Sequence, residues 1–537
     1  MALFTLRFWP LVSAATIANY LLSRWMHFEK QSTSVWTFST ALAVYLLYWS
    51  YLYPYFLSPL RHVPTVSGCP LWSHQLKIIN TEIGAAHREW HRTHGPIIRY
   101  FSLFGTEVLS VVDNAALKHI MVEAPYNYEK PVATRMFFSR LFGEGILSAE
   151  GKIHARQRKA LTPAFSISAI KALAPHFWHY SCSMSSYWEE DINESMDGSV
   201  SLNISDWASR ATLDIIAAVG FGAKIDTLHN PDAPLIQAFR TVFRFDAIAS
   251  LLAALHLLFP TARYLPIKAN REVDAAKRTL FEFGSDLIKE KEATINSTGN
   301  NILSQLVCGD RKPQVVGDNI FSKVICDQIA TFLGVGQDTS ATWLSWTLHL
   351  LSKHQHMQVK LREEIRSHFP FLFSSATCEK TDFTEFDVDR LPYLNNICRE
   401  SLRYIPPVPY VARVAVSDER LGEYFIPKGT IIHIPANTIH RLPEYWGSNP
   451  NTFDPDRWNC LPASYTNNAF IPFSHGPRGC IGRKFADTEV KTILCCLLSK
   501  FQFSPDPAFQ DPEELKRYRI VQKSLYGIRL KVSKLDG

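Results

Sequence analysis

The chain has 537 residues, 46% of them hydrophobic, which is ample for a large core and on length alone allows roughly two to four domains. The net charge of +6 is small for this length and gives no case for nucleic-acid binding, although a modest positive excess suits an acidic protein partner or a membrane surface. Ten cysteines without a Cys-x-x-Cys spacing indicate thiols in a reducing compartment, with neither zinc nor a disulfide framework.

The first 60 residues are predicted to form a membrane anchor from one or two apolar segments. Residues 35–57 carry no charge and are long enough to cross ~30 Å of hydrocarbon, although their many Trp and Tyr side chains suit the membrane interface better. A buried core helix is the alternative for this segment. Residues 8–22 are shorter and contain Pro10 and Asn19, which leaves a second span, a signal-anchor remnant and an interfacial helix open.

Residues 61–80 begin with a basic residue and contain two prolines and a glycine, which predicts a stiff hinge between the anchor and a globular body of residues 81–537. Helical periodicity dominates this body. Short runs of β-type sequence occur at residues 97–104, 107–112, 411–416 and 430–434. The pattern predicts a mainly α fold with small β-sheets.

Residues 243–265 are too apolar for an exposed loop. We expect part of this segment to dip into the membrane and to admit a lipophilic substrate. A buried pair of helices is the alternative interpretation.

Residues 323–354 lack proline and predict one long helix with Gly334 and Gly336 in its middle. Each glycine costs ~1 kcal/mol relative to alanine, so a compensating reason is expected: the missing side chain would leave room for a small molecule beside the helix. Asp338 and Thr339 follow directly. An acid next to an alcohol can form a proton path, with Thr339 bonding a distal oxygen and Asp338 relaying protons. A glycine-kinked structural helix is the alternative.

Glu400 and Arg403 are spaced i and i+3, so they share a helix face, but a lone pair of this kind is most often a surface contact worth under ~1 kcal/mol. His154 and Arg158 are one helical turn apart and can face one anionic group. Taken singly, each arginine of the chain is more often a surface charge than a ligand.

Cys480 lies in a glycine-rich loop in front of an apolar helical pattern, which places it at or just before a helix N-terminus. The helix dipole and nearby peptide N–H groups favour a thiolate there. A thiolate on a rigid loop can be the single axial ligand of a haem iron, and Phe473, seven residues upstream, can shield the sulfur from water. A buried, inert cysteine is the alternative.

The five fixed positions of the pattern Phe473-x-x-Gly-x-Arg478-x-Cys480-x-Gly482 resemble the haem-binding signature of the cytochrome P450 monooxygenases. The stretch 335–340 is similar to the oxygen-activation motif of that family, except that Val335 stands where a small residue is usual. The segment 453–458 resembles the family segment whose arginine, here Arg457, joins the Glu-x-x-Arg pair, with Asp456 replacing a glutamate.

The resemblance implies the cytochrome P450 fold, a haem b cofactor and specific roles for individual residues. Cys480 is the expected iron ligand, and Asp338 and Thr339 are the expected catalytic pair. Glu400, Arg403 and Arg457 are expected to lock the cysteine loop in place. The remaining expected haem-binding residues, of which the cations would meet the haem carboxylates, are His154, Arg158, Arg413, Phe473, Arg478 and Gly482.

The sequence looks most like membrane-bound enzymes of filamentous fungi that oxidise terpenoids and other secondary metabolites. The resemblance implies a monooxygenase that oxidises a lipophilic small molecule with O2 and with electrons from NADPH, delivered by NADPH-cytochrome P450 reductase docking near Arg156, Lys159 and Lys484. Substrate contacts are expected from residues 126–147, 243–265, 332–336 and 408–411. Anchoring in the endoplasmic reticulum, with the catalytic body facing the cytosol, is the expected location. A reductase-independent haem-thiolate isomerase or dehydratase and a non-catalytic membrane haem protein remain as alternatives.

Overall fold

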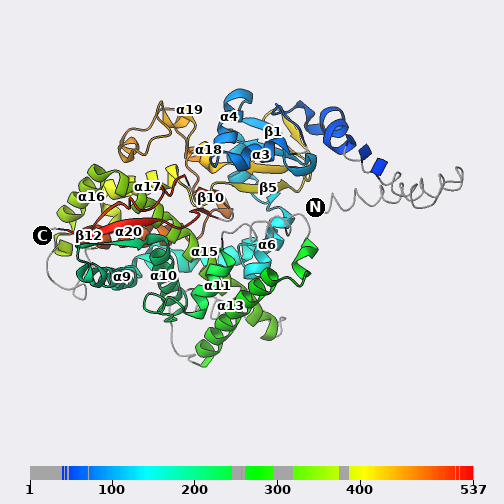
Figure 1. The fold of residues 1–537 in the computed structure, drawn as a ribbon. Coiled ribbons are helices and arrows are strands. Elements are labelled where there is room, and N and C mark those ends of the chain that lie inside the picture. Colours follow the sequence, from blue (N-terminus) through cyan, green and yellow to red (C-terminus); the bar gives the residue numbers. More distant parts are fainter. Residues whose placement is uncertain are drawn as a thin grey trace, which may run out of the picture. The chain divides into compact units, whose positions relative to one another are not determined.

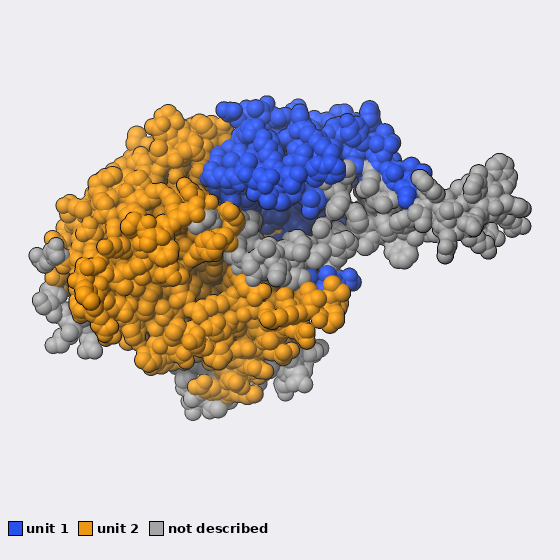
Figure 2. Space-filling view, viewed as in Figure 1, with its two compact units in different colours: residues 1–134, 254–262, 410–438 blue, residues 135–253, 263–409, 439–537 orange. Residues whose placement is uncertain are grey.

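The computed structural model describes residues 39–40, 43–44, 47–70, 72–244, 256, 260–293, 302, 318–373, 386–514, 516–518 and 521–535. The chain forms two compact units, each built from segments that are distant in sequence (Figure 2). Unit 1 comprises residues 1–134, 254–262 and 410–438. Unit 2 comprises residues 135–253, 263–409 and 439–537.

Unit 1 is organised around a five-stranded sheet with the strand order β1-β2-β8-β5-β3. β8 pairs with β2 in parallel, and the other neighbours are antiparallel. All four predicted β-runs are confirmed as strands of this sheet. Their bounds, with that of the short edge strand β3, are β1 Ile97–Phe101, β2 Glu107–Val111, β3 Tyr128–Glu129, β5 Val411–Ala415 and β8 Ile431–Ile434.

Helices α3 (Ser73–Asn80) and α4 (Ala85–His94) pack on β1 (Figure 1). Trp90 of α4 and Tyr100 of β1 are at the centre of this small core, with ring centroids 5.3 Å apart. The other elements of unit 1 are α5 Asn114–Lys118, β6 Glu419–Leu421, β7 Tyr424–Ile426 and the first residues of α18 Ala436–Ile439.

The chain enters unit 1 through a π-helical segment, Tyr48–Leu57, whose Pro54 carbonyl accepts a 2.8 Å hydrogen bond from Arg99. Within the described part of the chain we find no helix with the length and apolar character needed to cross a bilayer. The predicted segment 8–22 and the first residues of the predicted span 35–57 lie outside the described residues. So does most of segment 243–265; of its described residues, Tyr264 and Leu265 are exposed.

Unit 2 is predominantly helical and contains the large hydrophobic core. α15 packs on α10, and α20 packs along α9 (Figure 1). The helices are α7 Gly151–Leu161, α8 Ile167–Lys171, α9 Ala174–Glu194, α10 Ile204–Ile216, α11 Pro234–Val242, α13 Lys268–Ala293, α15 Asp318–Lys353, α16 Gln355–His368, α17 Pro392–Tyr404, α19 Pro443–Trp446 and α20 Arg483–Lys500; α6 Val132–Phe142 leads into the unit. Two small sheets complete it, formed by β4 Ser199–Asn203, β12 Arg529–Lys534 and β9 Phe501–Pro505, and by β10 Lys516–Tyr518 and β11 Gln522–Ser524. The predicted mainly α fold with small sheets is confirmed.

α15 confirms the single long helix predicted over residues 323–354, which ends at Lys353. Its residues from Ile325 to Ser352 are buried with three exceptions, and most hydroxyl side chains in this stretch bond carbonyls of their own helix, as Thr342 does to Asp338 at 2.7 Å. Between Ile325 and Ser352 only Val335, Gly336 and Thr339 are half-buried rather than buried. The helix therefore opens on one short face, at the motif that the sequence singled out.

Candidate functional site

Cys480 lies in the loop that leads into α20, which begins at Arg483 after Gly482, so the predicted position at a helix start is confirmed. Its backbone N–H donates a 2.8 Å hydrogen bond to the carbonyl of Phe473. Two left-handed residues, Ser474 with φ 56° and Gly476 with φ 68°, fold the loop back so that this bond can form. The sulfur is thus carried on a backbone with little conformational freedom.

Burial raises the pKa of the Cys480 thiol, and the Gly482 N–H and the charges of Arg158 and Arg483 offset only part of this effect. The N–H group and cations that were predicted to favour a thiolate are therefore present, and desolvation is the larger effect on the free thiol. The side chain nevertheless keeps an exposed surface. A metal ion deprotonates a coordinating thiol, so an accessible sulfur of this kind suits an iron ligand.

Phe473 connects the cysteine loop to the long helix. Its ring packs edge-on against Trp343 of α15 at a centroid distance of 5.9 Å. The Trp343 indole N–H donates in turn to the Ser401 hydroxyl of α17 at 2.9 Å. The sequence does not reveal this role of Trp343, because a contact with residues far along the chain leaves no periodic signal.

The predicted basic residues divide between the two units. Arg158 of α7 donates to the Gly479 carbonyl, and His154 on the same helix is buried. Arg478 forms an ion pair with Glu150, in which both side chains are only 4% exposed. Arg413 lies in unit 1, on β5, where it donates to the Ala412 carbonyl at 2.9 Å.

The structure therefore brings Arg158 and Arg478 to the cysteine loop. A thiol and two arginines on one loop and its neighbouring helix fit a prosthetic group that needs one axial ligand and cations for carboxylates. Glu150, which the sequence analysis missed, would share Arg478 with such a carboxylate.

At the open face of α15, Thr339 donates to the Val335 carbonyl at 2.8 Å. Asp338 is buried, and its Oδ1 accepts a hydrogen bond from Lys523. Burial raises the pKa of Asp338, and the Lys523 charge opposes this rise.

The prediction that the two glycines of α15 leave room for a small molecule needs correction. A Cβ at Gly334 would lie 2.4 Å from Cε1 of Phe142, so this glycine makes room for a packed ring and not for a small molecule. At Gly336 the nearest atom, Cγ1 of Ile216, would be 3.4 Å away, and the position is half-open. The predicted space beside the helix is therefore restricted to the side of Gly336.

Glu400, Arg403 and Arg457 meet as the resemblance implies. The Glu400 carboxylate accepts from Arg403 at 2.7 and 2.8 Å and from Arg457 at 3.3 Å. Trp458 also donates to it, at 3.0 Å. Arg403 further bonds the His440 carbonyl at 2.8 Å, and the His440 ring accepts from the Ile471 N–H at 2.9 Å. This route links the cluster to the chain just before the cysteine loop.

His440 was not anticipated as part of this link. It is fully buried, and burial, with the charge of Arg403, lowers its pKa to about 3. The ring is therefore neutral and can accept the bond from Ile471.

Comparison with known proteins agrees with this geometry. The sequence profile of the family Cytochrome P450 matches residues 63–528. The chain is 32% identical to the cytochrome P450 monooxygenase sphH of Aspergillus fumigatus, over 86% of this chain and 87% of that protein. It is 31% identical to the cytochrome P450 monooxygenase ALT8 of Alternaria alternata (84% and 86% covered) and 32% identical to FUM15 of Gibberella moniliformis (84% of each). The chain belongs to the cytochrome P450 family.

Proposed function

We propose that this protein is a haem-thiolate monooxygenase of fungal secondary metabolism that oxidises a lipophilic small molecule, with Cys480 as the ligand to the haem iron. The observation that carries the proposal is the combination of an accessible cysteine on a fixed loop with an alcohol, Thr339, at the half-buried face of α15 and a neighbouring buried acid, Asp338. In the overall reaction, O2, NADPH, a proton and a C–H substrate give the hydroxylated product, NADP⁺ and water. The haem, when bound, supplies the oxygen chemistry.

The chain's own residues hold the cofactor and move protons. Cys480 Sγ would bind the iron, and Arg158 and Arg478 would meet the haem carboxylates, a role for which His154 and Arg413 are also predicted. Thr339 Oγ1 would hold a proton at the half-buried face of α15, and the Asp338 carboxyl group would replenish it. Phe473 would shield the sulfur from water, and Gly482 would allow the loop to lie close to the haem.

We further propose that residues 1–60 anchor the protein in the endoplasmic reticulum, with the catalytic body of residues 81–537 facing the cytosol. Exposed apolar side chains at the described end of this segment support the anchor: Tyr51 is 57%, Phe56 66% and Leu57 56% exposed. NADPH-cytochrome P450 reductase is assigned to the face of α7 that carries Arg156 and Lys159, both exposed. Lys484, also predicted for this contact, forms ion pairs with Asp389 and Asp487 and is less available.

The test of the iron ligand is the carbon monoxide difference spectrum of the reduced protein. Cys480→Ala is expected to lose the thiolate-specific absorption band, while Cys460→Ala, which removes another exposed cysteine, keeps it. Survival of the band in Cys480→Ala would remove this residue from its role.

The test of the reaction class is NADPH oxidation with reductase and a panel of lipophilic substrates. A monooxygenase consumes one NADPH for each oxygen atom inserted. Product formed without NADPH would instead favour the isomerase or dehydratase alternative.

A further inference from the structure

Two described stretches near the C-terminus, residues 511–514 and 521–523, contact one side of α15. The residues of α15 that bind these stretches are Asp338, Trp346, His349 and Lys353, and their spacings of eight, three and four keep them on one side of the helix. We propose that Lys523, at the end of the second stretch, is the positioning residue that holds Asp338 for proton transfer. This inference rests on the proposed function and names a residue that no family motif includes.

The Lys523–Asp338 contact joins a buried side chain to a partly exposed one. Lys523 lies on β11 and donates to Oδ1 of Asp338. The side chain of Asp338 is 3% exposed, whereas that of Lys523 is 25% exposed. The pair therefore offers a proton a route from solvent to the acid.

Oδ2 of Asp338 has no hydrogen-bond partner among the residues that the structure describes. Lys523 thus restrains one oxygen of the carboxylate and leaves the other available for a proton chain toward Thr339. Among the described residues, Lys523 is the charged group that acts on Asp338, while the acid Glu489 of α20 interacts with the next residue, Ser340.

The position of Lys523 is itself held by contacts of its neighbours. The indole N–H of Trp346 donates to the Gln522 carbonyl at 2.8 Å, and the Gln522 N–H donates to the Pro407 carbonyl at 2.8 Å. The ammonium also lies 5.4 Å from the centre of the Phe243 ring. A lysine fixed by its strand and its ring contact restrains a partner better than a mobile surface lysine does.

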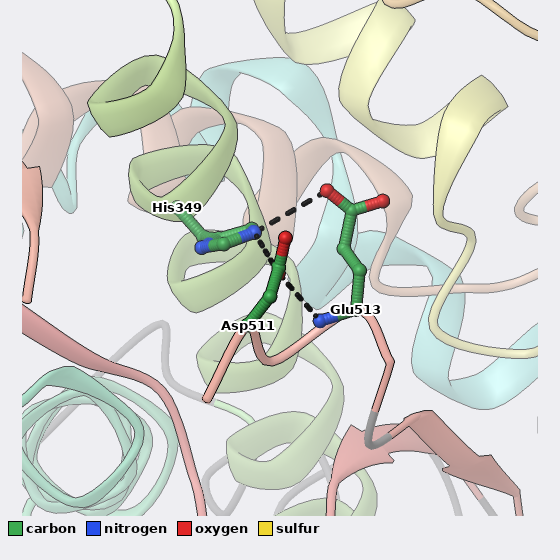
Figure 3. Close-up of side chains that lie close together, drawn as sticks. All are labelled: His349, Asp511 and Glu513. Carbon is green, nitrogen blue, oxygen red and sulfur yellow. Dashed lines mark hydrogen bonds and ion pairs between the residues drawn. The ribbon is translucent and has the colours of Figure 1, made fainter. Parts of the chain in front are cut away.

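The first of these two stretches is fixed by ion pairs at the end of α15 (Figure 3). Nε2 of His349 lies 3.3 Å from Glu513 and 3.4 Å from Asp511. These three groups lie within 4.8 Å of one another, a spacing that a metal ion could also use. The ammonium of Lys353, 2.8 Å from Asp511 and 3.1 Å from Glu513, already balances their charge. We therefore interpret the cluster as a tether.

The chemical consequence is a change in the protonation of Asp338 when Lys523 is lost. A carboxylate with so little solvent contact is stable as an anion only beside a cation. In Lys523→Met the carboxyl group is expected to keep its proton to higher pH and to stop cycling protons. Lys523→Arg retains the cation and is expected to retain the behaviour of the wild type.

The experiment is an infrared pH titration of the carboxyl band in the full-length holoprotein. The band of Asp338 is identified by its loss in Asp338→Asn. In Lys523→Met its titration midpoint is expected to rise by about 2 pH units or more relative to wild type. In Lys523→Arg, and in Lys531→Met, which removes an exposed lysine of β12, it is expected to stay in place.

A second measurement connects this shift to turnover: the pH profile of NADPH oxidation with reductase. The rate in Lys523→Met is expected to fall ~10-fold or more near neutral pH, with a larger solvent isotope effect, and to be restored in Lys523→Arg. An unchanged Asp338 midpoint in Lys523→Met would overturn the proposal, as would a midpoint in Lys523→Arg that moves as far as in Lys523→Met. The infrared result needs no substrate, so it stands apart from failure of the proposed function. If Lys523→Met does not fold, Lys523→Gln is measured against Lys523→Arg by the same criteria.

Discussion

Arg403 and Glu400 form a two-pronged ion pair one turn apart on α17, with both side chains fully buried. The guanidinium also donates to the carbonyls of His440, Pro450 and Thr452 at 2.6–2.8 Å. Burying two charges is costly, and here every nitrogen of the Arg403 guanidinium donates to at least one oxygen. The pair therefore specifies how the segment before the cysteine loop is held, rather than adding stability in proportion to its charge.

Arg403→Met is expected to lower the unfolding free energy by roughly 3–5 kcal/mol, because Glu400 would remain buried with its main cation gone. Urea denaturation followed by circular dichroism measures this loss. Arg399→Met is the matched control: Arg399 is exposed on the same helix, and its guanidinium lies 5.7 Å from the centre of the Trp458 ring. Its loss is expected to cost under ~1 kcal/mol. Equal effects of the two substitutions would contradict the assigned difference.

Gly334→Ala is expected to destabilise the protein although alanine is the better helix former. The new Cβ would lie 2.4 Å from Phe142, and overpacking of about 1–3 kcal/mol exceeds the ~1 kcal/mol gained in helix propensity. Gly336→Ala, with its nearest neighbour at 3.4 Å, is expected to change stability by less than ~1 kcal/mol. Phe142→Leu should rescue Gly334→Ala in the same urea assay; a double variant no more stable than Gly334→Ala would refute the assigned clash.

The features that the sequence predicted well are those encoded by neighbouring residues. The long helix, the four strands and the placement of Cys480 before α20 all follow from local periodicity and glycine positions. The meeting of Glu400 with Arg457 came from resemblance alone, since nothing local joins residues so far apart. Periodicity is a property of one element and does not report what packs against it.

The features that could not be predicted depend on partners distant in sequence. Lys523 lies 185 positions from Asp338, and Glu150 lies 328 positions from Arg478. The balance of effects at Cys480 could not be predicted for a related reason: the Gly482 N–H and Arg483 are local, whereas desolvation comes from the whole surrounding fold and Arg158 lies far away in the sequence.

The tether at His349 is expected to weaken above neutral pH. Burial alone would lower the pKa of His349, but hydrogen bonds to Asp511 and Glu513 outweigh it and raise the pKa above 6.5. Its stabilisation is thus fully present below pH 6.5 and is lost as the pH rises through the folded-state pKa. On the acid side, burial opposes ionisation of Glu513, but His349, Lys516 and Lys353 lower its pKa to about 2. The stabilisation that the Glu513 carboxylate contributes is complete above the ordinary pKa of 4.5 and is lost as the pH falls toward 2.

Hydrogen exchange of residues 511–514, corrected for the intrinsic pH dependence, measures this tether. Protection in the wild type is expected to fall between pH 6.5 and 9. His349→Gln should show low protection with no such fall, and His356→Gln, at an exposed position of α16, should behave as wild type. A fall of equal size in His349→Gln would assign the pH dependence to another group.

Glu489 of α20 is expected to make the protein less stable as the pH rises. It is fully buried, and burial raises the pKa of its carboxyl group from 4.5 to about 8, with the nearby Ser340 offsetting only part of the effect. Between these values the folded state keeps a proton that the unfolded state releases, so stability falls by up to about 1.4 kcal/mol per pH unit.

Glu489→Gln removes the titration, and its advantage over the wild type should therefore be larger at pH 8 than at pH 5 and level off above pH 8. Glu363→Gln, at an exposed site on α16, should show a constant difference in the same denaturation series. A constant difference for Glu489→Gln as well would mean that this carboxyl group has the same pKa in the folded and unfolded chains, and the assigned effect of its burial would be refuted.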